Sequence, residues 1–173
     1  VNKMILTMSN QFAESQPFFS TTMEMKPSFF APKEDMSLSL PLDPAKLRQL
    51  IDGGYCEQAP LGRGSETVVD LETRRCWRLM LGSDVLIGHS DFNASMTHAG
   101  LNVHSILYEV QEKLLPQSFG DKDVWAEPYT MLIYEKGGFF TPHRDTLRGK
   151  HHFGTLVISL PVQGGCEGGA FEL

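Results

Sequence analysis

Two apolar runs of strand length, separated by a short polar segment, lie between residues 129 and 160. The first run reads YTMLIYE and the second GTLVISL, and both are rich in residues that favour β-strands. Gly137 and Gly138 break the chain after the first run. His143 and Asp145 follow two positions apart, so their side chains point to one face if the segment is extended. This part of the chain therefore predicts a β-sheet that carries a pair of metal-binding side chains.

Imidazole and carboxylate are the ligand types of a non-haem Fe(II) site, which takes a third ligand from elsewhere in the chain. A His-x-Asp pair is a weak signal by itself, because short motifs occur often by chance. Its position strengthens it, since an apolar strand ending in Tyr134 precedes the pair and a strand beginning at Gly154 follows it. His143 and Asp145 are therefore the candidate metal ligands.

Two helices are expected before this region. Asp43 suits an N-cap, Pro44 suits the first helical turn, and Gly53 ends the pattern, so a helix is expected over residues 43–53. Apolar residues recur at helical spacing over residues 103–114, and Pro116 follows them. The sequence between the two helices includes residues 82–98, for which no regular element is predicted.

Strand signals dominate the remainder. The expected strands are residues 66–70, 75–80, 129–135, 139–145, 154–160 and 170–173. The glycines around Arg63 form a GRGS loop that lacks the lysine and the spacing of a phosphate-binding loop, so a turn is predicted there. Helices first and strands later predict an α+β or mainly β fold.

The domain organisation is predicted from the length of the chain and from the composition and periodicity of its segments. Residues 1–40 mix Met, Ser, Phe and Pro without a sustained period, which predicts a loosely structured N-terminal arm that packs a few aromatic side chains onto the domain. A partly disordered leader is the alternative. Residues 41–173 are expected to form a single domain, since 173 residues suit one core better than two.

Composition restricts the partners. A net charge of −6 and a pI of about 5.5 argue against broad nucleic-acid binding. Three widely spaced cysteines form no CxxC pair, which favours a reducing compartment. No apolar stretch is long enough for a membrane span. We therefore expect an intracellular protein of the cytoplasm or nucleus, without a membrane partner.

The segments YEKGGFFTPHRDT, FGTLVISLP and EGGAFEL together resemble the Fe(II)- and 2-oxoglutarate-dependent dioxygenases, most closely their prolyl-hydroxylase-like branch. The resemblance is good over residues 129–173 and fainter over residues 61–77. It does not extend to residues before about 40. In that family a tyrosine strand, a glycine loop, His-x-Asp, a Thr-Leu-rich strand and a Gly-Gly turn follow one another in this order.

The resemblance implies a double-stranded β-helix, or jelly roll, with buttressing helices on its N-terminal side. His143, Asp145 and a distal histidine would bind Fe(II), with 2-oxoglutarate and O2 at the remaining coordination positions. Hydroxylation of an aliphatic carbon would accompany decarboxylation of 2-oxoglutarate to succinate. Tyr134 matches a family tyrosine that hydrogen-bonds the cosubstrate, and a core aromatic on a buried strand is its alternative interpretation. The substrate, a protein or a small molecule, is left open.

Three parts of the family pattern are missing. One is the basic residue that, in the family, follows the distal histidine and grips the far carboxylate of 2-oxoglutarate. Only His151 and His152 follow Asp145, and they come too early for the distal histidine. The matching region holds four candidate strands, whereas a jelly roll has about eight. We therefore expect a jelly roll that is incomplete at its C-terminus, with further sequence or another chain supplying the missing strands.

Two other hypotheses stay open. An incomplete metal site would suit a non-catalytic binding module of the same fold. A zinc site could instead use His143, Asp145 and one of the pair His151 and His152, although structural zinc usually has four ligands. The remaining histidines, namely His89, His98 and His104, are interpreted as loop or surface residues rather than ligands.

Overall fold

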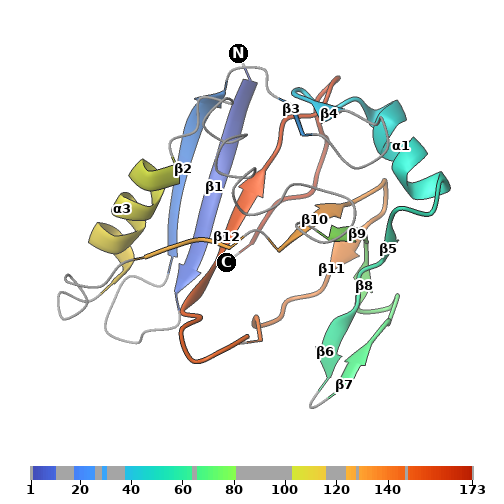
Figure 1. Ribbon diagram of the computed structural model, residues 1–173. Coiled ribbons are helices and arrows are strands. Elements are labelled where there is room, and N and C mark those ends of the chain that lie inside the picture. Colours follow the sequence, from blue (N-terminus) through green and yellow to red (C-terminus); the bar gives the residue numbers. More distant parts are fainter. Residues whose placement is uncertain are drawn as a thin grey trace.

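The computed structural model describes residues 2–10, 18–25, 29–30, 38–63, 66–80, 103–115, 124–127, 129–146 and 148–172. Within this part of the chain the fold combines two helices with small antiparallel sheets (Figure 1). The described strands do not close into a barrel. The predicted α+β class is confirmed at this level. Among these residues no helix is both long and apolar enough to cross a membrane.

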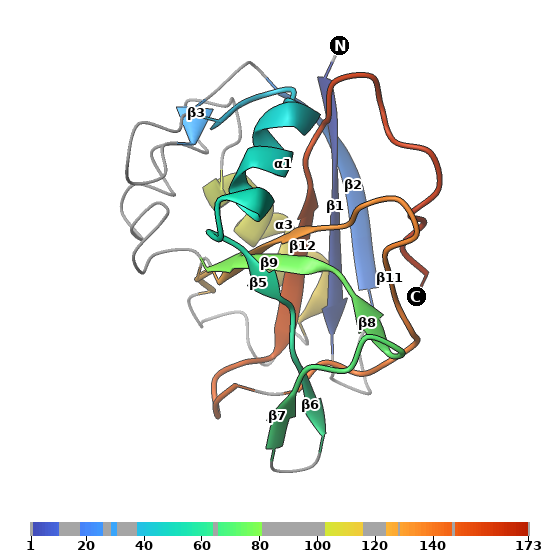
Figure 2. The ribbon, with the colours of Figure 1, turned by 90° about the vertical axis from the view of Figure 1, so that its right-hand side faces the viewer.

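The longest strands form one sheet in the order β12-β1-β2. β1 (Asn2–Asn10) lies between β12 (Gly154–Ser159) and β2 (Phe18–Met25), and both neighbours run antiparallel to it. The strand predicted at residues 154–160 is confirmed by β12. Figure 2 shows the three strands side by side when the molecule is turned.

The N-terminal residues differ from the loosely structured arm that their sequence predicts, because β1 and β2 are regular strands. The physical reason is the position of β1 at the centre of the sheet. A central strand forms hydrogen bonds along both edges, which compensates for a weak local pattern. Its partner β12 comes from near the other end of the chain, so no local window of sequence shows the pairing.

A second sheet has the order β10-β9-β5. β10 (Thr130–Ile133) pairs with β9 (Trp77–Met80), which pairs in turn with β5 (Glu57–Gln58). These pairings confirm strands within the predicted segments 75–80 and 129–135. Gln58 and Ile133 both lie opposite Trp77, one on each side of β9.

The remaining strands are two-stranded pairs. β11 (Phe139–Phe140) pairs with β8 (Arg74–Arg75), and β3 (Phe29–Phe30) pairs with β4 (Leu38–Ser39). β6 (Leu61–Arg63) and β7 (Glu66–Val68) pair antiparallel from either side of the predicted GRGS turn.

Two strand predictions were wrong: one predicted strand is much shorter than expected, and the other is not formed. The segment 139–145 is a strand only at its first two residues, because β8 offers only two residues to pair with. Residues 170–172 form no strand, since no neighbouring strand is paired with them in the described part of the chain. Residues 82–98 lie outside the described residues.

Both predicted helices are confirmed. α1 (Pro44–Asp52) begins at the N-cap Asp43, whose carboxylate accepts a hydrogen bond of 2.8 Å from the backbone N–H of Ala45. The backbone N–H of Gly53 caps the other end by bonding to the carbonyl of Gln49. α3 (Val103–Leu114) contacts β2 of the long sheet. The side chain of His104 in this helix lies outside the described residues.

One hydrophobic core joins these elements. Its fully buried members include Leu50 of α1, Leu79 of β9, and Val110 and Leu114 of α3. Burying one such side chain stabilises the fold by about 1.5–3 kcal/mol relative to leaving it exposed. Both helices therefore pack against the same core as the second sheet.

The segment 38–42 adds three leucines to this core. Leu38, Leu40 and Leu42 alternate with other residues along the chain and are between 1% and 3% exposed. Period-two alternation is the pattern of a strand with one buried face. The core therefore begins inside the region for which a loose arm is predicted.

A polar network ties α1 to the strand that leads into the His-x-Asp segment. The Trp77 indole N–H donates to Glu135 Oε2 over 2.8 Å, and the Arg48 guanidinium bonds to the other oxygen of Glu135. Arg48 also pairs with Asp52, one helical turn along α1. The two carboxylates raise the pKa of Arg48, and Arg48 lowers the pKa of Asp52. The network is exposed, so it fixes orientation more than it stabilises.

Candidate metal centre

The His-x-Asp segment is anchored by the pair β8–β11. Phe140 lies opposite Arg74, and the backbone N–H of Thr141 donates to the carbonyl of Thr73 over 3.0 Å. After Thr141 the chain leaves the ladder, so His143 and Asp145 stand on a loop rather than on the extended strand that period-two spacing predicts.

The loop nevertheless brings the two predicted ligands together. His143 Nε2 lies 3.5 Å from Asp145 Oδ1, and the side chains are 38% and 42% exposed. This separation is too long for a good direct hydrogen bond. Two atoms bound to one metal ion at about 2.1 Å lie about 3.0–3.4 Å apart, depending on the angle between the bonds. The 3.5 Å spacing is slightly longer than this range, so it is compatible with a shared metal ion after a small adjustment and does not distinguish one from a loose ion pair.

The orientation of the His143 ring leaves one nitrogen for a metal. His143 Nδ1 lies 2.9 Å from the carbonyl oxygen of Thr141. A carbonyl only accepts, so Nδ1 carries the proton and Nε2 of the neutral ring has an available lone pair. Metal-binding histidines typically donate their other N–H to a carbonyl or carboxylate in this way. The chemistry of this donor pair fits Fe(II).

Stacked side chains hold the ring in place. The imidazole of His143 stacks on Phe140, with ring centroids 3.5 Å apart and planes inclined by 19°. The guanidinium carbon of Arg74 lies 4.4 Å from the centroid of the same phenyl ring. Arg74, Phe140 and His143 therefore form one stack that begins on β8 and ends at the candidate ligand.

Tyr134 lies close to this stack, directly after β10. It is 46% exposed, and burial of the remainder raises its pKa to about 12. The Cys76 thiol adds to this rise, and the guanidinium of Arg74 opposes it. The neighbours of the Tyr134 hydroxyl are thus a thiol and a cation. Its phenol stays protonated at neutral pH and can donate a hydrogen bond to an anion.

The two later histidines do not join the pair. His152 Nδ1 accepts the backbone N–H of Arg148 over 3.0 Å, and Nε2 bonds to the carbonyl of Gly154 over 2.7 Å. Both nitrogens of His152 are therefore occupied by its own loop, which disfavours a zinc site that includes it. Over the described ranges no three His, Cys, Asp or Glu side chains are arranged to hold a metal ion. His89 and His98 lie outside these ranges.

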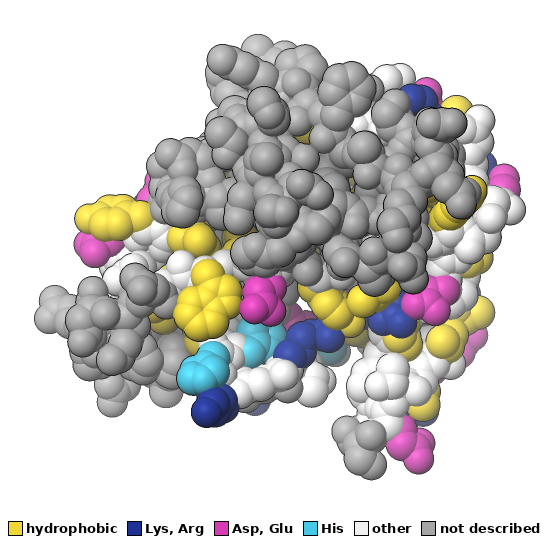
Figure 3. All heavy atoms as spheres, in the orientation of Figure 1, with side chains coloured by type: hydrophobic (Ala, Val, Ile, Leu, Met, Phe, Trp, Pro, Cys, Tyr) yellow, Lys and Arg dark blue, Asp and Glu magenta, His cyan; other side chains and the backbone are white. Residues whose placement is uncertain are grey.

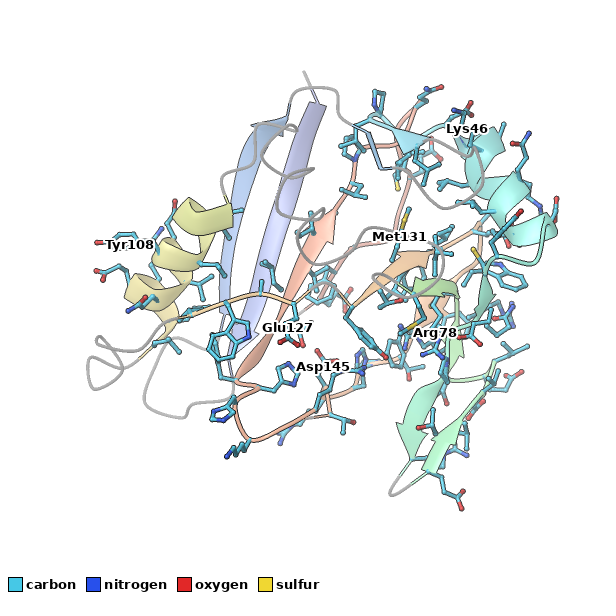
Figure 4. All side chains as sticks on the ribbon, viewed as in Figure 1. Lys46, Arg78, Tyr108, Glu127, Met131 and Asp145 are labelled. Atoms are coloured by element: carbon cyan, nitrogen blue, oxygen red, sulfur yellow. The ribbon has the colours of Figure 1, made fainter. Side chains whose placement is uncertain are left out.

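The pair is accessible from solvent. In the orientation of Figure 3, histidine side chains lie beside basic and acidic ones on the lower part of the surface. Figure 4 places Asp145 in the same region of the view, with Glu127 drawn next to it.

Sequence reasoning did not single out Arg74, Cys76 and Phe140. A signal for the first two exists in the run TRRCW, where the pair at positions 74 and 76 shares one face of an extended chain. The contact with Phe140 has no local signal, because it is made across two strands.

We compared the chain with models of protein families, with curated proteins and with solved structures, and none of the three comparisons gave a significant match.

Proposed function

We propose that the protein is an Fe(II)- and 2-oxoglutarate-dependent dioxygenase of the prolyl-hydroxylase-like branch, whose antiparallel sheets belong to a jelly-roll core. It would hydroxylate an aliphatic carbon of a protein or small-molecule substrate. The observation that carries the proposal is the pair His143 and Asp145. Its ligand atoms are 3.5 Å apart, and the second ring nitrogen of the histidine is engaged by Thr141.

In this proposal His143 Nε2 and one oxygen of Asp145 would hold the iron. Bound Fe(II) supplies the activation of O2 that accompanies decarboxylation of 2-oxoglutarate to succinate. The carbonyl of Thr141 keeps the proton on His143 Nδ1, so that Nε2 is free of it. The phenol of Tyr134, protonated at neutral pH, would donate a hydrogen bond to a carboxylate of the cosubstrate. A third ligand would come from outside the described residues.

The test is an anaerobic titration of Fe(II) and 2-oxoglutarate, followed through the charge-transfer absorption between iron and the ketoacid. The wild-type protein should develop the band, and the double variant His143→Ala, Asp145→Ala should not. His151→Ala is the matched control, since it removes an exposed histidine eight residues from the first ligand, and it should keep the band. A folded wild-type protein without the band would contradict the proposal.

A second candidate function is a non-catalytic binding module of the same fold. It is favoured by the absence, among the described residues, of a group of three side chains that could hold a metal. In that case Asp145→Ala would leave both folding and partner binding intact, and the wild-type protein would not turn over 2-oxoglutarate.

A further inference from the structure

The chain between β11 and β12 contains a short turn that carries cations but no carboxylates. Residues 148–152 read RGKHH, and we call them the basic turn. The sequence holds no Asp or Glu between Asp145 and Glu167, so no acidic neighbour in the chain offsets these charges. Arg148 and Lys150 are both exposed. The turn therefore presents two positive charges to solvent, although the whole chain has a net charge of −6.

Arg148 and Lys150 have no carboxylate partner among the described residues. The ion pairs made there by arginine and lysine use cations of α1, β6, β9 and α3. None of these pairs includes a cation of the basic turn. Both charges are therefore available to an anion from outside the described part of the chain.

Hydrogen bonds hold the backbone of the basic turn in one conformation. The backbone N–H of His152 donates to the carbonyl of Gly149 over 3.1 Å. His152 Nδ1 accepts the backbone N–H of Arg148 over 3.0 Å, so Nε2 carries the proton and donates to the carbonyl of Gly154 over 2.7 Å. Ordering a loop on binding costs affinity, and a turn that is already closed avoids much of this cost.

The guanidinium of Arg148 is held as well. Its central carbon lies 3.6 Å from the centroid of the Tyr129 ring, which is 37% exposed. At this separation the planar group lies flat on the ring, because an N–H directed at the ring would bring its nitrogen too close. The N–H donors therefore point outward from the edge of the stack, where they can form a two-point contact with a carboxylate.

The aromatic rings near the turn favour a peptide over a nucleic acid as the anionic partner. Single-stranded nucleic acids bind by stacking their bases on free aromatic faces beside basic residues. Arg148 covers one face of Tyr129, and the ring of Phe140 lies between His143 and Arg74. These two rings have at most one free face between them. Carboxylates need only the charged N–H donors, which the turn supplies.

The basic turn lies close to the candidate metal centre. Arg148 is three residues beyond Asp145, so their Cα atoms lie within about 11 Å of each other. Figure 3 shows basic and histidine side chains together on the lower part of the surface, and Figure 4 shows Asp145 in that region. An extended peptide covers the same distance in about three residues.

We propose that the basic turn binds an acidic peptide segment, with Arg148 and Lys150 contacting carboxylates of that partner. Such charge-assisted contacts give specificity for partners of opposite charge. The role of the partner rests on the proposed function, in which it is the protein substrate. An acidic residue of the substrate would then lie about three positions from the residue that is hydroxylated.

The first experiment needs neither iron nor cosubstrate. Fluorescence anisotropy in EDTA would measure binding of a fluorescein-labelled peptide of alternating Glu and Gly residues. We expect the double variant Arg148→Gln, Lys150→Gln to bind about tenfold more weakly than the wild type, because two contacts to carboxylates are lost. The matched control is Arg75→Gln, Lys136→Gln, which removes two exposed, unpaired cations outside the turn. It should bind like the wild type.

A single variant separates the charge from the structure of the turn. Arg148 also contacts Tyr129, so its loss could disturb the turn itself. The side chain of Lys150 makes no ion pair within the described ranges, and Lys150→Gln alone should weaken binding by about threefold. Its urea midpoint should equal that of the wild type. Raising the salt concentration should weaken binding to the wild type and reduce the difference between the two proteins.

Three results of this experiment would overturn the inference. The first is a wild-type protein that does not bind the glutamate peptide. The second is an equal loss of affinity in the control variant, which would show that only the total charge matters. The third is tighter binding of a single-stranded oligonucleotide of the same charge, which would make the partner a nucleic acid.

The second experiment tests whether the partner is a substrate. Two pools of random peptides, one with Glu and the other with Gln at two fixed positions, would be compared as stimulants of 2-oxoglutarate decarboxylation. The wild type should prefer the Glu pool by about tenfold, and Arg148→Gln, Lys150→Gln should lose this preference. Equal stimulation of the wild type by both pools would reject an acidic substrate.

The outcomes also separate this inference from the proposed function. Peptide binding that depends on Arg148 and Lys150, in a protein without the charge-transfer band, would retain the peptide site and reject the dioxygenase. A protein that develops the band but does not bind the glutamate peptide would retain the dioxygenase and reject the peptide site.

Discussion

At the scale of single residues, the ring of His143 is positioned by its contacts rather than by its own backbone segment. It donates to the carbonyl of Thr141 and stacks on Phe140, while the loop that carries it has no ladder hydrogen bonds beyond Thr141. Neighbours that orient a metal ligand typically change metal affinity by about 10- to 100-fold when they are mutated.

Replacing Phe140 with leucine tests this positioning. We expect Phe140→Leu to weaken Fe(II) binding by about tenfold, because the stacking surface under the imidazole is lost while an apolar side chain remains. Anaerobic metal titration measures the effect. Phe139→Leu is the matched control, since it lies next in the same strand and contacts Arg75 instead. Equal losses of affinity in both variants would show that the stack has no specific role.

The phenol of Tyr134 gives a prediction about pH. Its pKa of about 12 in the folded protein lies above the ordinary value of 10.0, so the folded state holds this proton more tightly than the unfolded state. The resulting stability is fully present below pH 10 and is lost as the pH rises towards 12. Because the side chain is 46% exposed, we expect the loss to be only about 1 kcal/mol.

Urea denaturation between pH 9 and pH 12 measures this loss. Tyr134→Phe lacks the titrating group, so its stability should fall less over the same interval. Ultraviolet absorbance of tyrosinate gives an independent check, since one tyrosine should ionise after the rest. Parallel curves for the variant and the wild type would argue against the raised pKa.

At the scale of elements, α1 depends on the cap at its first turn. The Asp43 carboxylate accepts from the backbone N–H of Ala45, which has no partner within the helix. α1 carries Leu50 and Ile51 into the core and Arg48 into the network with Glu135. Loss of the cap should therefore disturb both the core and this network.

Changing this cap gives a prediction for the helix. Asp43→Ala should lower the free energy of unfolding by about 1 kcal/mol, because an N–H at the helix start loses its acceptor. Asp43→Asn keeps an oxygen at the same place and should cost much less. Both values come from urea denaturation followed by far-ultraviolet circular dichroism. An asparagine variant as unstable as the alanine variant would mean that charge, rather than the hydrogen bond, is what matters.

At the scale of the whole molecule, the two ends of the sequence meet in one sheet. Leu6 of β1 lies between Ile158 of β12 and Thr21 of β2. The N-terminal strand is therefore an internal part of the sheet, and a disturbance in it should reach β12.

Thr7→Pro tests that placement. Proline removes the backbone N–H of a central strand and so breaks a ladder hydrogen bond. We expect the free energy of unfolding to fall by about 2 kcal/mol or more, together with faster amide exchange in β12 opposite it. Hydrogen exchange followed by mass spectrometry reads both strands. Unchanged stability and exchange would favour the loosely structured arm that the sequence alone predicts.

The sequence by itself determined the features that depend on neighbouring residues. Caps and helical periodicity located α1 and α3, and a β-branched run located β12. The two-residue spacing of His143 and Asp145 identified a pair that the structure brings together. These features can be predicted from the sequence because the interactions that produce them join residues only a few positions apart.

The tertiary structure decided what depends on residues far apart in the chain. Only strand pairing places β1 beside β12, and only the register of β8 with β11 places Arg74 over Phe140. The same pairing ends β11 at Phe140, so that a loop rather than a strand presents the candidate ligands. The local sequence of a strand does not show which distant strand it pairs with, because each strand alone is compatible with many pairing partners.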